Sequence, residues 1–281
     1  MVQLVQLRQR IKAIETIKKI THAMRLISIS THAHLKNKEA PLRHYRQNIH
    51  QLFTKIQSAS PTPYNAHSTL PYETNTLIIL IGSSKGLCGN FNTSLFNFFE
   101  NYMNEHPLAK TSVITIGKRA LTYANEHRLG TVLASPNKLT ATTLVPIAQT
   151  ITQVINDAEK PFSSVIVVSN VLKSFFNQKP QVYTLLPFSQ ESSSLPEAQE
   201  NSLEEYIWEQ PADEILEILA HQCMNANLQH LLFQSLIAEH AARFLSMDSS
   251  TRNAQNLLDQ TKLDYNKLRQ AKVTKELAEL M

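Results

Sequence analysis

Apolar residues recur every three or four positions at the start of the chain, which is the spacing of one helix face. They fall at Leu4, Leu7, Ile11 and Ile14, and then at Ile17, Ile20, Met24 and Ile27. These steps predict a coiled-coil seam that continues through one local shift of register. The first 40 residues contain no glycine or proline, so nothing interrupts this helix, which would be about 60 Å long.

The last 70 residues show the same periodicity and contain neither glycine nor proline. The seam positions are Leu216, Leu219, Cys223 and Ala226, followed by Ala254, Leu258, Thr261, Tyr265 and Leu268. A helix over residues 212–281 would be about 100 Å long, so it must project beyond an ordinary domain and pair along its length. We expect the N-terminal helix to be its antiparallel partner. The alternative is a compact helical bundle, in which a turn near residues 225–227 breaks the long helix.

The middle of the chain changes period. Short β-branched segments predict four strands, at residues 76–81, 112–116, 164–169 and 181–188. Between them, the pattern predicts helices at residues 91–102, 118–128 and 139–159. This alternation is typical of an α/β domain with a largely parallel sheet and an antiparallel pair at its end. We expect three parts: an N-terminal shaft helix at 1–60, a central α/β domain at 70–190, and a C-terminal shaft helix at 205–281.

Charge is distributed unevenly along the chain. Ten basic and two acidic residues give residues 1–50 a net charge of +8, whereas seven basic and twelve acidic residues give residues 201–281 a net charge of −5. This asymmetry indicates two complementary elements or two different partners. The basic arm has no aromatic residue before Tyr45 and no known nucleic-acid motif, so we expect no nucleic-acid partner. No segment approaches the roughly 18 apolar residues that span a bilayer, so we expect no direct membrane insertion.

The segment Gly82–Gly89, "GSSKGLCG", holds three of the five glycines and joins a predicted strand to a predicted helix. Such a turn is where many proteins bind phosphate. Here Lys85 precedes Gly86 instead of following a glycine, and the strict G-x-G-x-x-G pattern is absent. Lys118 and Arg119 stand where a dinucleotide site would have an acidic residue. We therefore favour a structural turn over the alternative, a dinucleotide-dependent oxidoreductase that uses this loop.

Other residues with catalytic potential show no recognisable site pattern. The spacing of His22, His32, His34, His44 and His50 indicates a polar helix face rather than a metal cluster. Cys88 has no His or Asp beside it in the motif, and we expect a small buried side chain there. The stretch "EHAAR" at 239–243 fits a packing interface as readily as catalysis. We expect no cofactor, no metal and no catalytic residue.

Three blocks of the sequence resemble the gamma subunit of the rotary ATP synthase. They are "RIKAIETIKKITHAMRLIS" at 10–28, "SSKGLCGNFN" at 83–92, and the stretch 239–280 that begins "EHAARFLSMDSSTRNAQ". The blocks occur in the family's order and spacing, so the resemblance covers nearly the whole chain. The glycine loop departs from the family pattern, with Ser84 in place of an acidic residue and Asn90 in place of a glycine.

The resemblance implies a fold and a role. In the family, the two terminal helices form a left-handed antiparallel coiled coil, the central shaft, beside a central Rossmann-like α/β domain. The shaft is non-catalytic and couples ion-driven rotation of the c-ring to conformational cycling of the catalytic beta subunits. The implied partners are the alpha and beta subunits of the head, the epsilon subunit and the c-ring. The implied location is the cytoplasmic face of the bacterial inner membrane, as a peripheral subunit. A coiled-coil scaffold without a motor role is a further alternative.

The resemblance also assigns candidate contact residues by position. Those that match family contacts with the alpha/beta head are Met24, Arg25, Arg269, Gln270, Thr274 and Glu276. A basic shaft face that could meet an acidic loop of the beta subunit comprises Arg8, Arg10, Lys12, Lys18 and Lys19. Candidates for the foot, near the c-ring and epsilon, are Tyr206, Glu209 and Gln210. Arg243, Met247, Thr251 and Asn253 match the preceding C-terminal motif.

Overall fold

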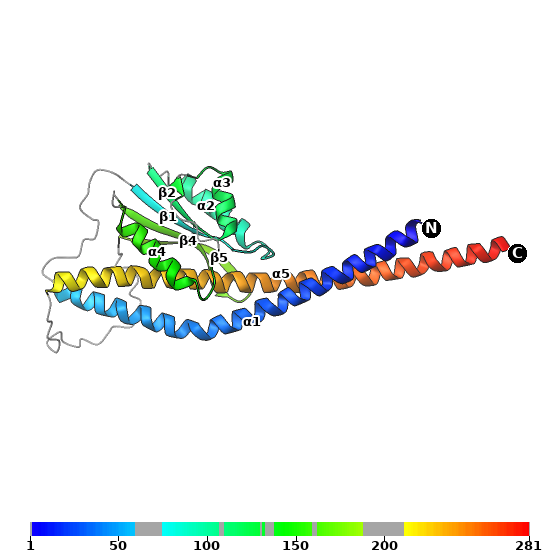
Figure 1. Ribbon diagram of the computed structural model, residues 1–281, viewed down its shortest axis with the longest axis horizontal. Helices are drawn as coiled ribbons and strands as arrows, with labels where there is room; N and C mark the ends of the chain where they lie inside the picture. Colours follow the sequence, from blue (N-terminus) through cyan, green and yellow to red (C-terminus); the bar gives the residue numbers. More distant parts are fainter. Residues whose placement is uncertain are drawn as a thin grey trace.

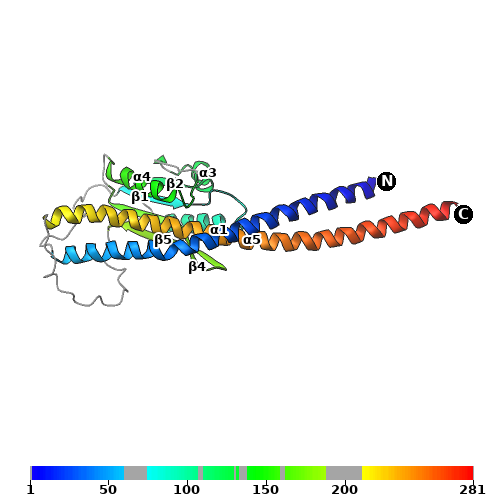
Figure 2. The same ribbon diagram turned by 60° about the horizontal axis from the view of Figure 1, so that its bottom comes forward.

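Two long helices lie side by side in the computed structural model, and a small α/β domain covers one half of their length (Figure 1). The structure describes residues 2–59, 75–106, 110–129, 131–132, 138–158, 162–187 and 211–280. The first helix, α1, spans Val2–Ala59 and the last, α5, spans Ala212–Leu280. They run antiparallel, with both chain ends at the same tip (Figure 2). The expected coiled coil with a central α/β domain is confirmed.

Helix α5 is continuous over 69 residues, so the alternative of a bundle broken near residues 225–227 is wrong. Helix α1 continues through Pro41 to Ala59, although proline removes one backbone hydrogen bond of the helix. Beyond that proline, Ile49, Phe53 and Ile56 are buried against the start of α5. Tertiary packing therefore sustains a segment that local propensity alone would interrupt.

The predicted seam of α1 is correct as far as Ile14, and after Ile14 only Met24 of the predicted members is half-buried. Leu4, Leu7 and Ile11 are half-buried and Ile14 is buried, but Ile17, Ile20 and Ile27 are 53–57% exposed. The seam continues instead through four polar residues, Lys18, Thr21, Arg25 and Ser28. Spacing explains the difference, because these polar residues keep the alternating steps of four and three, whereas the isoleucines would need a shift of register.

The predicted seam of α5 agrees better with the structure. Its buried members are Leu216, Cys223, Ala226, Ala254, Leu258 and Thr261, and its half-buried members are Leu219 and Tyr265. Leu268 is 40% exposed, so the seam prediction is wrong at its last position. The two helices are therefore paired along most, but not all, of the length of α5.

The domain contains a five-stranded sheet in the order β3-β2-β1-β4-β5. The strands are β1 (Asn75–Ile81), β2 (Lys110–Ile116), β3 (Thr131–Val132), β4 (Ser164–Ser174) and β5 (Asn177–Leu186). All neighbours are parallel except β4 and β5, as the sequence predicted. The two-residue β3 was not predicted, because so short a strand has no periodicity to detect.

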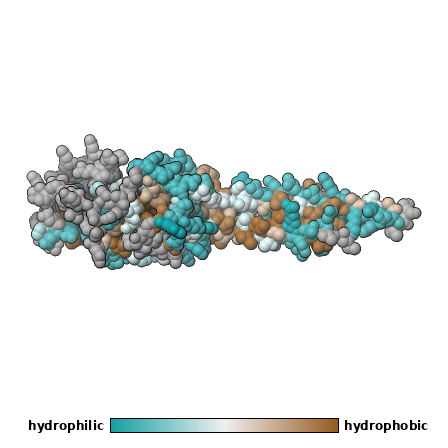
Figure 3. All heavy atoms as spheres, turned by 90° about the horizontal axis from the view of Figure 1, so that it is seen from above, coloured by the Kyte–Doolittle hydropathy of each residue, from teal (hydrophilic) through white to brown (hydrophobic). Residues whose placement is uncertain are grey.

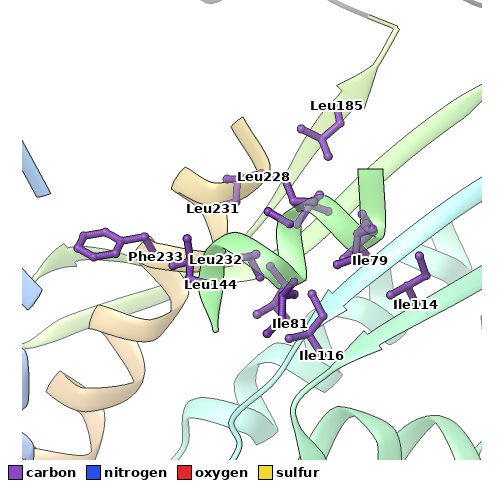
Figure 4. Packing of buried hydrophobic residues seen from close by; sticks show 14 of the residues in the cluster. Ile79, Ile81, Ile114, Ile116, Leu144, Leu185, Leu228, Leu231, Leu232 and Phe233 are labelled. Carbon is purple, nitrogen blue, oxygen red and sulfur yellow. The ribbon is translucent and has the colours of Figure 1, made fainter. Parts of the chain in front are cut away.

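Alternate residues of β1 face two different layers. Ile78 and Leu80 pack against α2 (Phe91–Glu105) and α3 (Lys118–Glu126). Leu77, Ile79 and Ile81 belong to a larger cluster that includes α4 (Leu144–Asn156) and the α5 residues around Leu232. Figure 4 shows this second cluster, in which leucines of α5, the helix α4 and isoleucines of the sheet lie together. The shaft helix is thus itself one layer of the domain core.

The shaft has two parts, which differ in whether the domain lies against them. The covered shaft comprises residues 28–59 of α1 and 212–246 of α5, where the domain lies against the helices (Figure 1). The bare shaft is defined as residues 2–27 and 247–280, most of which extend beyond the domain (Figure 1). No helix in the described parts of the chain combines the length and the apolar character that crossing a membrane requires.

Candidate functional site

The glycine loop follows β1 at the carboxyl edge of the sheet, where α/β proteins commonly bind ligands. Its conformation depends on glycine at specific points. Gly89 has a φ of +57°, and Gly117 in the neighbouring loop has a φ of +90°. A Cβ on Gly117 would lie 2.4 Å from the carbonyl oxygen of Gly82, so the two loops approach too closely for any side chain there.

Asn92, the second residue of α2, binds the loop to the helix that follows it. Its Oδ1 accepts a hydrogen bond from the Ser83 backbone N–H at 3.0 Å, and its Nδ2 donates to Ser83 Oγ at 2.8 Å. Ser84 Oγ accepts the backbone N–H of Leu139 at 2.9 Å, which ties the loop to the segment before α4. The polar groups at the start of the loop are therefore bonded within the domain.

The rest of the loop is bonded to the shaft. The Arg243 guanidinium donates to the carbonyl oxygens of Lys85, at 3.0 Å, and Gly86, at 3.3 Å. Glu239, one helical turn away, forms an ion pair with Arg243 and accepts the backbone N–H groups of Ser84 and Lys85. Glu239 and Arg243 are only 4% and 3% exposed. An internal carboxylate thus takes the donors that a phosphate would need, which favours the structural role of the loop.

The ionisation of this pair follows from burial and contact. Burial raises the pKa of the Glu239 carboxyl, while Arg243 and the two loop N–H groups oppose that shift. Cys88 in the same loop is 3% exposed, and burial raises the pKa of its thiol. A buried, protonated thiol is a poor nucleophile, so the expectation of a packed side chain at Cys88 is confirmed. Among the described residues, no three His, Cys, Asp or Glu side chains come together as a metal site would need.

The predicted basic face lies on the bare shaft. Arg8, Arg10, Lys12 and Lys19 are exposed, whereas Lys18 is half-buried and donates a hydrogen bond to Gln255 of α5. Lys18 is therefore partly exposed on the basic face and partly engaged in the seam between the helices. Exposed apolar side chains accompany the basic ones, among them Ile17 and Ile20. Figure 3 shows hydrophobic and hydrophilic patches alternating along this part of the molecule.

Arg25, a predicted head contact, is engaged within the shaft. Its Nη1 donates to Asp248 Oδ1 at 2.7 Å, and Arg252 pairs with the other oxygen of the same carboxylate. These bonds hold the pKa of Asp248 below its usual value, chiefly through Arg25. Met24 beside it is half-buried. Sequence reasoning missed Asp248, because a contact between residues 223 positions apart leaves no local signal.

The other predicted head contacts lie nearer the tip of α5. Arg269, Gln270, Thr274 and Glu276 are all exposed. Lys262 pairs with Glu15 at 3.2 Å, so these four residues lie beyond that level, well separated from Met24 and Arg25 along the shaft. The structure thus divides the predicted contacts into two groups. The predicted foot residues Tyr206, Glu209 and Gln210 lie outside the described residues.

Glu239 was also missed as a site residue, although the sequence carried a signal for it. An acid and an arginine four positions apart on a helix lie on the same face, where they can pair. Sequence reasoning noted the stretch 239–243 as a possible interface without finding its partner, which is the glycine loop. The fold therefore joins the second sequence block to the third through Arg243, and the first to the third through Arg25 and Asp248.

The class of protein follows from this geometry: a projecting two-helix shaft whose base is built into a small α/β domain. A model of the ATP synthase family matches residues 3–281. The ATP synthase gamma chain of Chlorobium phaeobacteroides is 28% identical, over 98% of this chain and 95% of that relative. The gamma chain of Verminephrobacter eiseniae is 29% identical over the same shares. The chain belongs to the ATP synthase family, among its gamma chains.

Solved structures share the fold. The rotor of the Euglena gracilis mitochondrial ATP synthase superposes with a TM-score of 0.67 at 15% identity, covering 96% of this chain and 99% of that one. The central stalk of the Tetrahymena thermophila mitochondrial enzyme gives a TM-score of 0.59 at 18% identity, covering 82% and 98%. The resemblance inferred from the sequence is confirmed, and the oxidoreductase alternative finds no support in these comparisons.

Proposed function

We propose that this chain couples ion-driven rotation of a c-ring to conformational cycling of catalytic beta subunits, and that it contributes no catalytic group of its own. The observation that carries the proposal is the bare shaft, which projects beyond the domain as two paired helices. Its α5 part alone, residues 247–280, is about 50 Å long at about 1.5 Å per residue. An uninterrupted helix pair without glycine or proline is stiff, as the transmission of torque requires.

The glycine loop supports the non-catalytic part of the proposal. Asn92 and Glu239 take up the backbone N–H groups of residues 83–85, and Arg243 takes up the carbonyl oxygens of residues 85 and 86. A nucleotide phosphate would have to displace a buried carboxylate that is already paired with an arginine. The chemistry of ATP therefore belongs to other subunits in this proposal.

The proposed partners are the alpha and beta subunits of the head, epsilon and the c-ring. The exposed basic residues of the bare shaft suit an acidic loop on the beta subunit, because opposite charges attract without the deep interlock that would hinder rotation. Arg269, Gln270, Thr274 and Glu276 would contact the head near the tip of α5, and Met24 with Arg25 lower on the shaft. The exposed isoleucines Ile17 and Ile20 add an apolar component that the sequence analysis did not expect.

The foot in this proposal includes Tyr206, Glu209 and Gln210, near the c-ring and epsilon. The proposed parts are residues 1–60 and 205–281 for the shaft and 70–190 for the side domain. The proposed location is peripheral, on the cytoplasmic face of the bacterial inner membrane. The related structures are a rotor and a central stalk with its c-ring, which is consistent with these partners.

The test is reconstitution of the complete synthase in vesicles, with this chain as the shaft subunit. ATP hydrolysis and the ion gradient it creates are measured together, once with protons and once with sodium as the coupling ion. We expect Arg269→Ala with Gln270→Ala to lower coupled pumping at least threefold. Lys275→Ala, an exposed neighbour, is the matched control and should stay within 1.5-fold. A complex that hydrolyses ATP without building either gradient would refute the proposal.

A further inference from the structure

Helix α5 passes the glycine loop just before it leaves the domain and becomes the bare shaft. Ala238 and Ala242 are buried there against Cys88 and Phe91 of the loop region. The side chains of Glu239 and Arg243 face the same loop and bond to its backbone. Two successive turns of α5 are therefore held from one side, by apolar contact and by a buried ion pair.

A second contact reaches both helices at the same level. Phe175 lies in the turn between β4 and β5, and its ring meets His32 of α1 edge-on, with 4.9 Å between ring centroids. The same ring contacts Phe244 of α5 at 5.4 Å. Because Phe244 directly follows Arg243, the loop and the β4–β5 turn contact adjacent residues of one helical turn. We call Glu239, Arg243 and Phe175 the collar.

An open pocket adjoins these contacts. It has a volume of about 330 Å³ and lies between the loop, the β4–β5 hairpin and α5, where Gly89, Asn170, Gln178 and Ser246 are among the residues that line it. Continuous apolar packing therefore does not fix the helix at this level. The large apolar cluster of the domain grips α5 earlier, from Met224 to Ile237. The collar lies beyond this cluster, close to the point where α5 leaves the domain.

We propose that the collar sets the angular position of the shaft where it leaves the domain, so that rotation of the domain passes to the bare shaft without slack. Glu239, Arg243 and Phe175 are positioning residues in this inference, which rests on the proposed function above. A load on the bare shaft acts through a long lever, and it is resisted first at the point of exit. A buried ion pair suits this task, because its bonds are directional and one partner cannot leave without stranding the other.

The first variant, called the released variant, removes the bonds between α5 and the glycine loop while approximately keeping the volume of the two buried side chains. Glu239→Leu combined with Arg243→Met replaces an ion pair by apolar groups, a change that proteins often tolerate. In the complete synthase, we expect ATP hydrolysis within twofold of the wild type and ions pumped per ATP reduced to a third or less. Backbone amides of residues 84–86 should exchange their hydrogen at least tenfold faster. A merely structural role would lower hydrolysis and pumping together.

The second variant refastens the loop by another bond. A Cβ on Gly89 would lie 3.5 Å from the Cβ of Ser246, within the range of a disulfide. Gly89→Cys with Ser246→Cys is added to the released variant in a Cys88→Ala background, and Cys88→Ala alone is the control. We expect oxidation to restore at least two thirds of the pumping per ATP, and reduction to remove it again. A cysteine at residue 89 is strained by the left-handed backbone there, but this strain is present in both the oxidised and the reduced variant. The difference in pumping between the two forms therefore reports the disulfide alone.

The aromatic contact is tested by Phe175→Ala, with Phe176→Ala as the matched control because Phe176 is 78% exposed. We expect pumping per ATP to fall at least twofold in the first and to stay unchanged in the second. The collar is overturned if the released variant pumps normally, if its loop amides exchange as in the wild type, or if the oxidised crosslink fails to restore pumping. Failure of the wild-type synthase to pump at all would refute the proposed function instead.

Discussion

The covered shaft and the bare shaft are built from the same two helices but are stabilised differently. In the covered shaft, Leu228, Leu232 and Leu236 of α5 are at most 3% exposed and share one cluster with the sheet and α4. In the bare shaft, the apolar cluster comprises Ile14, Ala254 and Leu258, with Ile11 at its edge. Polar contacts supply much of the rest, such as the hydrogen bond of 3.0 Å between Thr251 Oγ1 and Thr21 Oγ1.

The comparison teaches that helical pairing alone gives a shaft little apolar burial. A two-helix seam buries one narrow stripe of each helix, whereas a helix built into a domain buries a wider face. We therefore expect the covered shaft to unfold with the domain and the bare shaft to open locally at lower free energy. Each of the following measurements would sharpen or break that contrast.

The largest effect is expected from Leu232→Ala in the covered shaft. Removing this fully buried side chain should lower the free energy of unfolding by about 3–5 kcal/mol, because the surrounding core cannot collapse around the cavity. Urea unfolding of the full chain measures it. Leu263→Ala, at a position that is 60% exposed, is the control and should change stability by less than about 0.5 kcal/mol. Equal losses in the free energy of unfolding for the two variants would contradict the contrast between the covered shaft and the bare shaft.

Ile14→Ala in the bare shaft should cost less, about 2 kcal/mol, since a thin seam can close around the missing atoms. The loss should be local. Hydrogen exchange should speed up for residues 2–27, while the strands of the domain keep their protection. If the sheet lost protection to the same extent, the two parts of the shaft would be one cooperative unit.

A pH dependence should distinguish the covered shaft. Burial, with Arg46 and Arg43 nearby, lowers the pKa of His230 to about 4. Burial, with Arg243, His32 and Lys85 nearby, does the same for His240. Both histidines are neutral when folded and take up protons on unfolding below their unfolded pKa of 6.5, so stability falls as pH drops from 6.5 toward 4.

The expected loss between pH 7 and pH 5 is about 1–2 kcal/mol for each histidine. Urea unfolding at the two pH values measures it. His240→Gln should remove its share of the pH dependence, whereas His22→Gln, at an exposed position of the bare shaft, should leave the pH dependence as it is. A pH profile that neither substitution changes would show that these histidines are not the cause.

The smallest effect is expected from Asp248→Asn at the root of the bare shaft. The pKa of Asp248 is depressed by Arg25, so its contribution is present above pH 3.8 and is lost as pH falls below that value. Both side chains are half-buried, and ion pairs that solvent still reaches contribute little and are screened by salt. We expect slightly faster amide exchange around Arg25 at low salt and no difference at 1 M salt. A large loss in the free energy of unfolding of the whole chain would contradict the expectation that this ion pair contributes little.

Much of the architecture could be predicted from local patterns. The absence of glycine and proline predicted continuous terminal helices, and the change of period predicted the strands and the antiparallel pair. The seam of α1 shows the limit. Apolarity alone selected Ile17, Ile20 and Ile27, whereas pairing with α5 buries Thr21 and Ser28, because register is set by both helices together.

The candidate site divides in the same way. The sequence marked the glycine loop, the stretch 239–243 and the basic face as separate features. It could not show that Glu239 and Arg243 bond to the loop, since that contact joins segments more than 150 residues apart. The head contacts assigned to Arg269, Gln270, Thr274 and Glu276 stay predictions, as do the foot residues.

The sequence by itself determined that the chain has two long terminal helices around an α/β domain, because helix breakers and apolar periodicity act over a few residues at a time. Its three blocks also determined the family. Which face of each helix is buried, and what the glycine loop binds, became known from the three-dimensional fold. Those outcomes depend on which surfaces meet, and a carboxylate from the far end of the chain occupies the loop because the fold carries α5 past it.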